Sequence, residues 1–132
     1  MDPRMRRMEG FSIGELAREF GVTLRTLRFY EDKELLHPHR RGQSRIYSRR
    51  DRARLKLILM GKRVGFSLGE IRDMLELYDL KGAQVTQLRH AAETFRAQID
   101  SLRMRRDHID EAISDLTRTY EIVTGMLKER EG

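Results

Sequence analysis

The sequence predicts a mainly α-helical protein, with a short β-ribbon in its N-terminal half and one long C-terminal helix. Three observations lead to this fold class. Two short amphipathic segments are separated by only Gly21-Val22-Thr23, a glycine-centred stretch of alternating residues follows them, and apolar residues recur in a heptad pattern from Val85 onwards. Of the 132 residues 36% are charged and 7% aromatic, a composition that suits helices with solvated faces.

The first helix is expected between Ser12 and Gly21. Ser12 is its N-cap, and Glu15 stands three residues further on, as a capping box requires. Gly21 can adopt the left-handed conformation that ends a helix. The apolar residues fall at i, i+3, i+4 and i+7, so that one stripe faces a core: Ile13, Leu16, Ala17 and Phe20.

The second helix is expected over residues 24–31, capped by Thr23 and closed by the segment that leads to Pro38. Together the two helices form a helix-turn-helix pattern. If Leu27 faces inward, Leu24, Tyr30 and Glu31 turn to the same side, and the outward face carries Arg25, Arg28, Phe29 and Asp32. Two arginines three residues apart on an exposed face can reach base edges or phosphates from a DNA groove. The alternative is an ordinary solvated face.

Residues 40–47 predict a two-stranded wing with Gly42 at its turn. The ribbon carries Arg40, Arg41 and Arg45, which would repel one another unless a polyanion lay nearby. Tyr47 either anchors the wing in the core or hydrogen-bonds a phosphate.

Two more capping boxes, Ser48 with Asp51 and Ser67 with Glu70, open two further helices, separated by an interruption at residues 64–66. The second of these helices extends to Tyr78. Their free backbone N–H groups either hold DNA phosphates or only stabilise the helix.

The C-terminal tail keeps a heptad seam from Val85 to Leu127, a span of roughly 63 Å in an unbroken helix. A head of about 80 residues cannot bury so long a stripe, so we expect a second copy to cover it. A hairpin near residues 115–119 is the alternative. Arg106 interrupts the seam, and it either sets the register with an acidic partner residue or extends to solvent. The expected dimer interface comprises Leu88, Phe95, Ile99, Leu102, Ile109, Ile113 and Leu116.

Charge is divided unevenly along the chain. Residues 1–63 hold 17 Lys and Arg against 8 Asp and Glu, whereas residues 64–132 hold 10 against 13. A basic head on a mildly acidic tail is typical of a protein that binds a polyanion. Cysteine is absent, which excludes disulfides, zinc fingers and thiolate sensing. No apolar run is long enough for a membrane span, so we expect a soluble, cytoplasmic protein that does not associate with membranes.

An enzyme is not expected. His37 and His39 border Pro38 in a basic turn, and His90 and His108 lie on a charged helix without the spacing of metal ligands. No nucleophile–base pair or glycine-rich phosphate loop is present, and we predict neither a cofactor nor a metal site.

With these residues in place, the chain resembles a MerR-type transcription regulator. The matching residues are Ile13-Gly14-Glu15-Leu16-Ala17, Val22-Thr23, Thr26 to Glu31, Leu35-Leu36, Pro38, Arg45, Tyr47, Gly65-Phe66-Ser67-Leu68 and Glu70-Ile71. They cover residues 11–78 in order, which is far more specific than a lone helix-turn-helix. The stretch from Tyr47 to Arg63 also resembles a narrower branch, the LiuR-like regulators of branched-chain amino acid and acyl-CoA degradation.

The resemblance implies a winged helix-turn-helix DNA-binding domain at residues 11–78 and a dimerisation helix at residues 83–130 that forms an antiparallel coiled coil. It implies a homodimer on a pseudo-palindromic promoter site, where the DNA is bent and untwisted so that RNA polymerase can use the promoter. The implied DNA contacts are Arg25, Arg28 and Tyr30 from the second helix and Arg41, Arg45 and Tyr47 from the wing. The finer resemblance suggests an acyl-CoA ester as small-molecule effector.

The sequence departs from the family pattern in two ways. The cysteines of the metal- and redox-sensing members are missing, and residues 85–132 leave no room for a ligand domain. A different class of function therefore stays open, namely a non-specific nucleic-acid binder or a coiled-coil adaptor. Either would lack sequence preference, and the nucleic-acid binder would show only a steep salt dependence.

Overall fold

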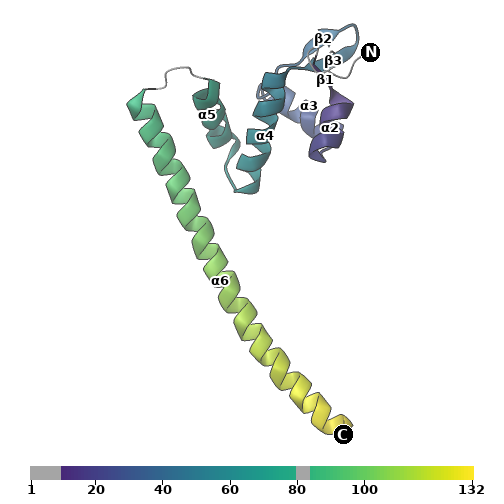
Figure 1. The fold of residues 1–132 in the computed structure, drawn as a ribbon, viewed down its shortest axis with the longest axis vertical. Coiled ribbons are helices and arrows are strands. Elements are labelled where there is room, and N and C mark those ends of the chain that lie inside the picture. Colours follow the sequence, from purple (N-terminus) through teal and green to yellow (C-terminus); the bar gives the residue numbers. More distant parts are fainter. Residues whose placement is uncertain (1–9, 80–83) are drawn as a thin grey trace. The chain divides into compact units, whose positions relative to one another are not determined.

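A computed structural model of the chain describes residues 10–79 and 84–132. The chain divides into two units, and the second consists of residues 84–132. We call the described part of the first unit, residues 10–79, the head. Its elements are β1 (Phe11–Ser12), α2 (Ile13–Phe20), α3 (Leu24–Asp32), β2 (His39–Arg41), β3 (Ser44–Tyr47), α4 (Arg49–Arg63) and α5 (Leu68–Asp79). The second unit contains α6 (Val85–Glu131), shown with the head in Figure 1. Position 83, the predicted start of the second domain, lies outside the described residues.

The wing is part of a three-stranded antiparallel sheet in the order β1-β3-β2. The predicted ribbon pairs Arg40 with Arg45, and Gly42 turns the chain with a φ of 63°. The sequence did not predict β1, which adds Phe11 opposite Tyr47 on the other edge of β3. Because β1 runs directly into α2, its pairing with β3 attaches the wing to the start of α2.

The predicted helix caps are confirmed. Ser12 and Ser48 each form a complete capping box, with Glu15 and Asp51 respectively. Gly21 ends α2 in the left-handed conformation, at φ 64° and ψ 36°. The hydroxyl of Ser67 likewise accepts from the N–H of Glu70. These local contacts satisfy backbone groups that the first turn of a helix leaves unpaired.

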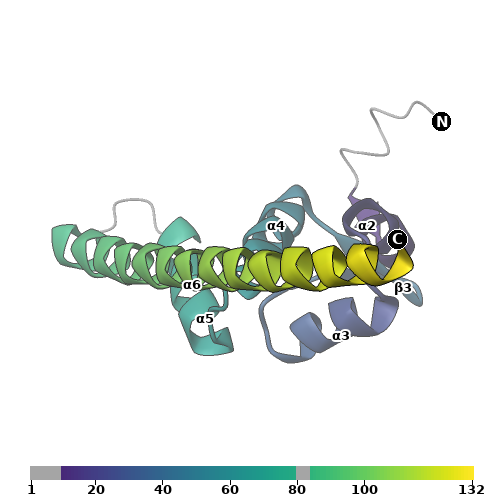
Figure 2. The same cartoon turned by 90° about the horizontal axis from the view of Figure 1, so that it is seen from below.

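One hydrophobic core holds the head together. Helix α2 packs on α3 and the sheet, while α4 packs on β3 and α5. Figure 2 shows the four helices of the head from below. The most completely buried residues come from the four helices of the head, the loop after α3 and strand β3. They are Leu16, Leu27, Tyr30, Leu35, Leu36, Tyr47, Leu55, Ile58, Ile71 and Leu75.

One expectation about the second helix was wrong. Leu24 does not share the buried side of Leu27, because it lies on the outward face and is 43% exposed. The helix ends at Asp32, within one residue of the predicted end, and Glu34 follows in the left-handed region with a φ of 61°. This turn, which comes before the segment that leads to Pro38, carries Leu35 into the core.

Helix α6 is continuous, so the alternative of a hairpin near residues 115–119 is wrong. Gly125 lies within the helix without ending it. No residue of α6 is buried in the single chain. Among the residues that the structure describes, no helix combines the length and the apolar character that crossing a membrane requires.

The contact between α4 and α5 predicts a stability effect at Gly61. A Cβ atom at Gly61 would lie 2.8 Å from Cγ1 of Ile71, a core residue. We expect Gly61→Ala to destabilise the head by about 1–3 kcal/mol through overpacking, measured by urea unfolding. The matched control is Gly69→Ala on exposed α5 surface, where the nearest side-chain atom is 3.8 Å away. That variant should be neutral or up to about 1 kcal/mol more stable. Equal effects of both variants would contradict the close approach.

Candidate nucleic-acid interface

Helix α3 has one face in the core and one face in solvent. Leu27 and Tyr30 are buried, whereas Arg25 and Arg28 are exposed. Beside the two arginines the outward face also carries exposed apolar side chains, Leu24 at 43% and Phe29 at 40%. Arginine can donate to guanine edges and phosphates, and apolar groups can contact thymine methyls, so this face has the chemistry for reading a DNA groove.

The N-terminal end of α3 is fixed by a local cap. The Oγ1 atom of Thr23 accepts from the N–H of Thr26 at 3.0 Å, and the two threonine hydroxyls lie 2.8 Å apart. The first turn of a recognition helix usually contacts base edges. The cap therefore fixes the backbone conformation of the turn that carries Arg25.

An ion pair ties the wing to α3. Nε of Arg45 donates to Oε2 of Glu31 at 2.7 Å, with both side chains partly buried. The sequence predicted Arg45 as a DNA contact, and the structure instead places its guanidinium against the helix. Arg40 and Arg41 remain exposed on β2, in the same antiparallel ribbon. The bond between Arg45 and Glu31 thus connects the ribbon of the wing to the arginine-bearing helix.

The two tyrosines predicted as DNA contacts are core residues, with Tyr30 1% and Tyr47 0% exposed. Burial raises the pKa of Tyr30, and it raises the pKa of Tyr47 to about 12 with a smaller contribution from the charge of Glu31. Tyr47 has the anchoring role that the sequence left open beside phosphate contact. The hydroxyl oxygen of Tyr47 is buried within the head, so this side chain leaves the predicted set. A DNA contact of Tyr30 stays a prediction.

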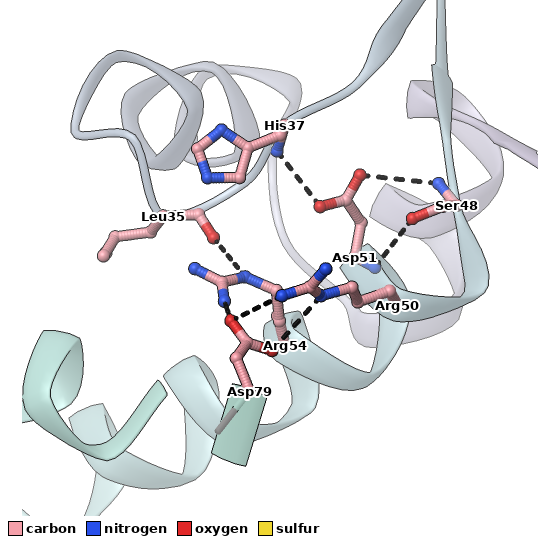
Figure 3. A network of polar contacts seen from close by, with 7 residues as sticks. All are labelled: Leu35, His37, Ser48, Arg50, Asp51, Arg54 and Asp79. Atoms are coloured by element: carbon pink, nitrogen blue, oxygen red, sulfur yellow. Dashed lines mark hydrogen bonds and ion pairs between the residues drawn. The ribbon is translucent and has the colours of Figure 1, made fainter. Parts of the chain in front are cut away.

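A buried arginine joins three segments of the head (Figure 3). Nε of Arg54 donates to the carbonyl oxygen of Leu35 at 2.9 Å, and its Nη1 pairs with Asp79 at the end of α5. Arg50 reaches the same carboxylate, with Nε 3.2 Å from Oδ1. Burial opposes the ionisation of Asp79, but the hydrogen bonds and charges of the two arginines outweigh it and lower its pKa. This network fixes the loop after α3 against α4 and α5.

Asp51 connects the same loop to the start of α4 (Figure 3). Its Oδ1 accepts from the N–H of His37 at 3.0 Å, while Oδ2 accepts from the N–H of Ser48 at 3.4 Å. The sequence predicted the cap but not the bond to His37, because that contact spans 14 residues.

A further arginine binds α4 to α2. Nε of Arg52 donates to Oε1 of Glu19 at 3.0 Å. Its guanidinium also lies 5.9 Å from the ring centre of Phe11 and 5.7 Å from that of Phe20, both within cation–π range. Part of the positive charge of the head is therefore neutralised in structural ion pairs. The positive charge that remains near the wing and α3 lies mainly on exposed arginines.

The fold and this exposed basic face define the class of a helix-turn-helix nucleic-acid-binding protein. A family model described as "MerR HTH family regulatory protein" matches residues 11–78, and one described as "MerR, DNA binding" matches residues 52–122. The chain belongs to the MerR family of helix-turn-helix regulatory proteins.

Individual relatives agree with this assignment. The chain is 34% identical over 90 residues to the HTH-type transcriptional regulator HmrR of Rhizobium leguminosarum bv. viciae, covering 67% of this chain and 70% of that protein. It is 33% identical over 119 residues to the HTH-type transcriptional activator mta of Bacillus subtilis, covering 87% of this chain but only 42% of that protein.

Solved structures give the same fold. The N-terminal part of the Bacillus subtilis multidrug transporter activator, MtaN, is 31% identical with a TM-score of 0.54, and the match covers 83% of this chain and 96% of that one. HiNmlR, a MerR family regulator lacking the sensor domain and bound to promoter DNA, has a TM-score of 0.66 at 21% identity, with 79% and 78% covered. The latter likeness concerns the fold alone.

The unpaired hydroxyl of Tyr47 leads to a stability prediction. Its oxygen is buried and has no hydrogen-bond partner in the described chain. Tyr47→Phe should therefore keep the stability of the head or raise it by about 1 kcal/mol, because an unsatisfied buried polar group is costly. Thermal unfolding followed by circular dichroism measures this. A loss of 2 kcal/mol or more, on the order of a charged hydrogen bond, would show that the hydroxyl does have a partner.

The network at Asp79 predicts a pH dependence. Because the folded-state pKa of Asp79 is lowered, its ionised form stabilises the head above the unfolded pKa, and this contribution disappears as the pH falls through the folded value. We expect Asp79→Asn to cost about 1–3 kcal/mol at pH 7. The cost should shrink below a pH of about 4 in urea unfolding. Asp73→Asn, on the exposed surface of the same helix, is the control and should change little. A cost of Asp79→Asn that stays constant down to pH 3 would contradict this origin.

Proposed function

We propose that the chain is a transcription regulator that binds a pseudo-palindromic promoter site as a homodimer. The observation that carries the proposal is the outward face of α3, where exposed Arg25 and Arg28 stand on a helix whose opposite face is fixed in the core. In a helix-turn-helix, such a helix lies in the major groove. Exposed Arg41 on the wing supplies a further contact to the DNA backbone. Membership of the MerR family supports this function, and it argues against an enzyme.

The exposed seam of α6 supports the homodimer. Leu88, Ile99, Ile109, Ile113 and Leu116 are all exposed in the single chain, and Phe95 and Leu102 belong to the same seam. Two copies paired through this seam bring two α3 helices to one duplex. A two-fold dimer matches a palindromic site, since each head reads one half-site.

We further propose that the dimer distorts the promoter and thereby controls its use by RNA polymerase in the cytoplasm. The named relatives support regulation of transcription, because HmrR and mta are a transcriptional regulator and a transcriptional activator. The LiuR-like branch and the acyl-CoA effector remain predictions from the finer resemblance alone. Neither relative is named as such a regulator.

Sequence preference separates this proposal from a non-specific binder. Fluorescence anisotropy of the full chain on its own promoter fragment and on a scrambled duplex, each across a salt series, measures both affinities. We expect a preference of about 10³-fold or more at physiological salt. Equal affinities that fall together with salt would contradict a sequence-specific regulator and favour an electrostatic binder.

Arg28 tests the role of α3 within the same assay. Arg28→Ala should weaken binding to the promoter by about 1–3 kcal/mol and relax the preference over scrambled DNA, if the side chain reads a base. The matched control is Arg118→Ala, which removes the same charge from an exposed position on α6 and should leave the preference unchanged. Equal weakening on both duplexes would assign Arg28 to a phosphate and contradict base reading.

A further inference from the structure

In the homodimer proposed above, two copies of α6 pair in one defined orientation and register. The charged residues of the helix indicate which one. We propose that α6 pairs antiparallel with its two-fold axis between Asp107 and His108, so that Leu102 lies opposite the partner's Ile113. We call this the central register. It rests on the proposed homodimer and adds a function for three charged residues, Arg103, Arg106 and Asp110.

In the central register, every seam position from Leu88 to Leu127 has a seam position opposite it. Leu88 faces the partner's Leu127, and Ile99 faces the partner's Leu116. These four side chains are between 48% and 71% exposed in the single chain.

The central register also pairs opposite charges beside the seam. In an antiparallel coiled coil, residues that flank the seam on the same side face each other and form interhelical ion pairs. Arg103 then faces the partner's Asp110, twice by symmetry. Neither residue makes an ion pair within the described chain. Arg106, the one charged seam residue, lies in the layer of the partner's Ile109, next to that same aspartate.

Registers shifted by one heptad place like charges against each other. Moving the axis towards the N-terminus brings Arg96 opposite the partner's Asp110. It also sets Arg103 against the partner's Arg103 and Arg105 against the partner's Arg105, so the attraction is offset. Moving it towards the C-terminus sets Asp110 against the partner's Asp110. Like charges held side by side are destabilising. The charges therefore favour the central register over both neighbours.

A parallel, in-register pair is disfavoured by Arg106. It would place the two Arg106 side chains in the same seam layer, where the apolar surroundings strengthen their repulsion. The central register places them in two adjacent layers, about 4.5 Å apart along the axis, instead of in one. Arg106 therefore favours the antiparallel orientation, a use known for single polar residues in coiled-coil seams.

Disulfide trapping tests the register in the full chain, because the sequence contains no cysteine. Leu102→Cys/Ile113→Cys should form covalent dimers on mild oxidation, read on a non-reducing gel. The two cysteines of one helix lie roughly 16 Å apart along its axis and cannot bridge each other. Leu102→Cys alone should stay uncrosslinked, because its copy in the partner lies a similar distance away.

Two matched double variants report the shifted registers. Phe95→Cys/Ile113→Cys bridges only with the axis moved towards the N-terminus, and Leu102→Cys/Tyr120→Cys only with it moved towards the C-terminus. Efficient trapping of either would overturn the central register. Trapping of Leu102→Cys alone would overturn the antiparallel orientation, and failure of all four variants to crosslink would overturn the pairing itself.

The ion pairs are tested by charge reversal and rescue. Asp110→Arg should weaken dimerisation by about 10-fold in sedimentation experiments, because it adds positive charge beside Arg103 and Arg106. Arg103→Asp/Asp110→Arg should recover most of the loss. Glu111→Arg, on the side of α6 away from the seam, is the control and should change little. Equal losses for Asp110→Arg and Glu111→Arg, or no rescue, would overturn the ion pair.

These outcomes are separate from the proposed function. A chain trapped in another register that still prefers its promoter would overturn the central register and leave the regulator intact. A chain that shows the central register without any sequence preference would overturn the proposed function alone.

Discussion

The association of the chain with a partner depends on the exposed apolar seam of α6. No residue of this 47-residue helix is buried in the single chain, and Leu116 is 71% exposed. Removing apolar surface from water stabilises a protein by about 25 cal/mol per Å², so a seam of this length strongly favours association. When a second copy of the chain covers the seam, the resulting dimer also contains a second head, and with it a second α3.

Within the head, charged side chains divide between two tasks. Arg45, Arg52 and Arg54 are held by Glu31, Glu19 and Asp79, and these pairs join elements that are far apart in the sequence. Arg25 and Arg28 stand exposed on α3 instead. A helix that reads DNA needs both properties, because its arginines must be available to the ligand while its backbone must be rigid.

Features that depend on nearby residues could be predicted from the sequence. The capping boxes at Ser12 and Ser48, the left-handed Gly21 and the continuous heptads of α6 all follow from local spacing. Features that are decided by tertiary packing could not be predicted from the sequence. Leu24 was expected inside because periodicity alone does not locate the centre of a buried face. The pairing of β1 with β3, and of Arg54 with Asp79 across 25 residues, has no local signal. The same limit explains Tyr47, where an aromatic ring with a hydroxyl suits a core as well as a phosphate.

Pairing through α6 should link dimerisation to the reading of DNA by two heads. The mass of the complex between the full chain and a duplex of its promoter, measured by light scattering with size separation, tests that link directly. We expect two chains per duplex, together with a large loss of affinity when one half-site is scrambled. One chain per duplex, bound equally well by the half-scrambled DNA, would contradict that link.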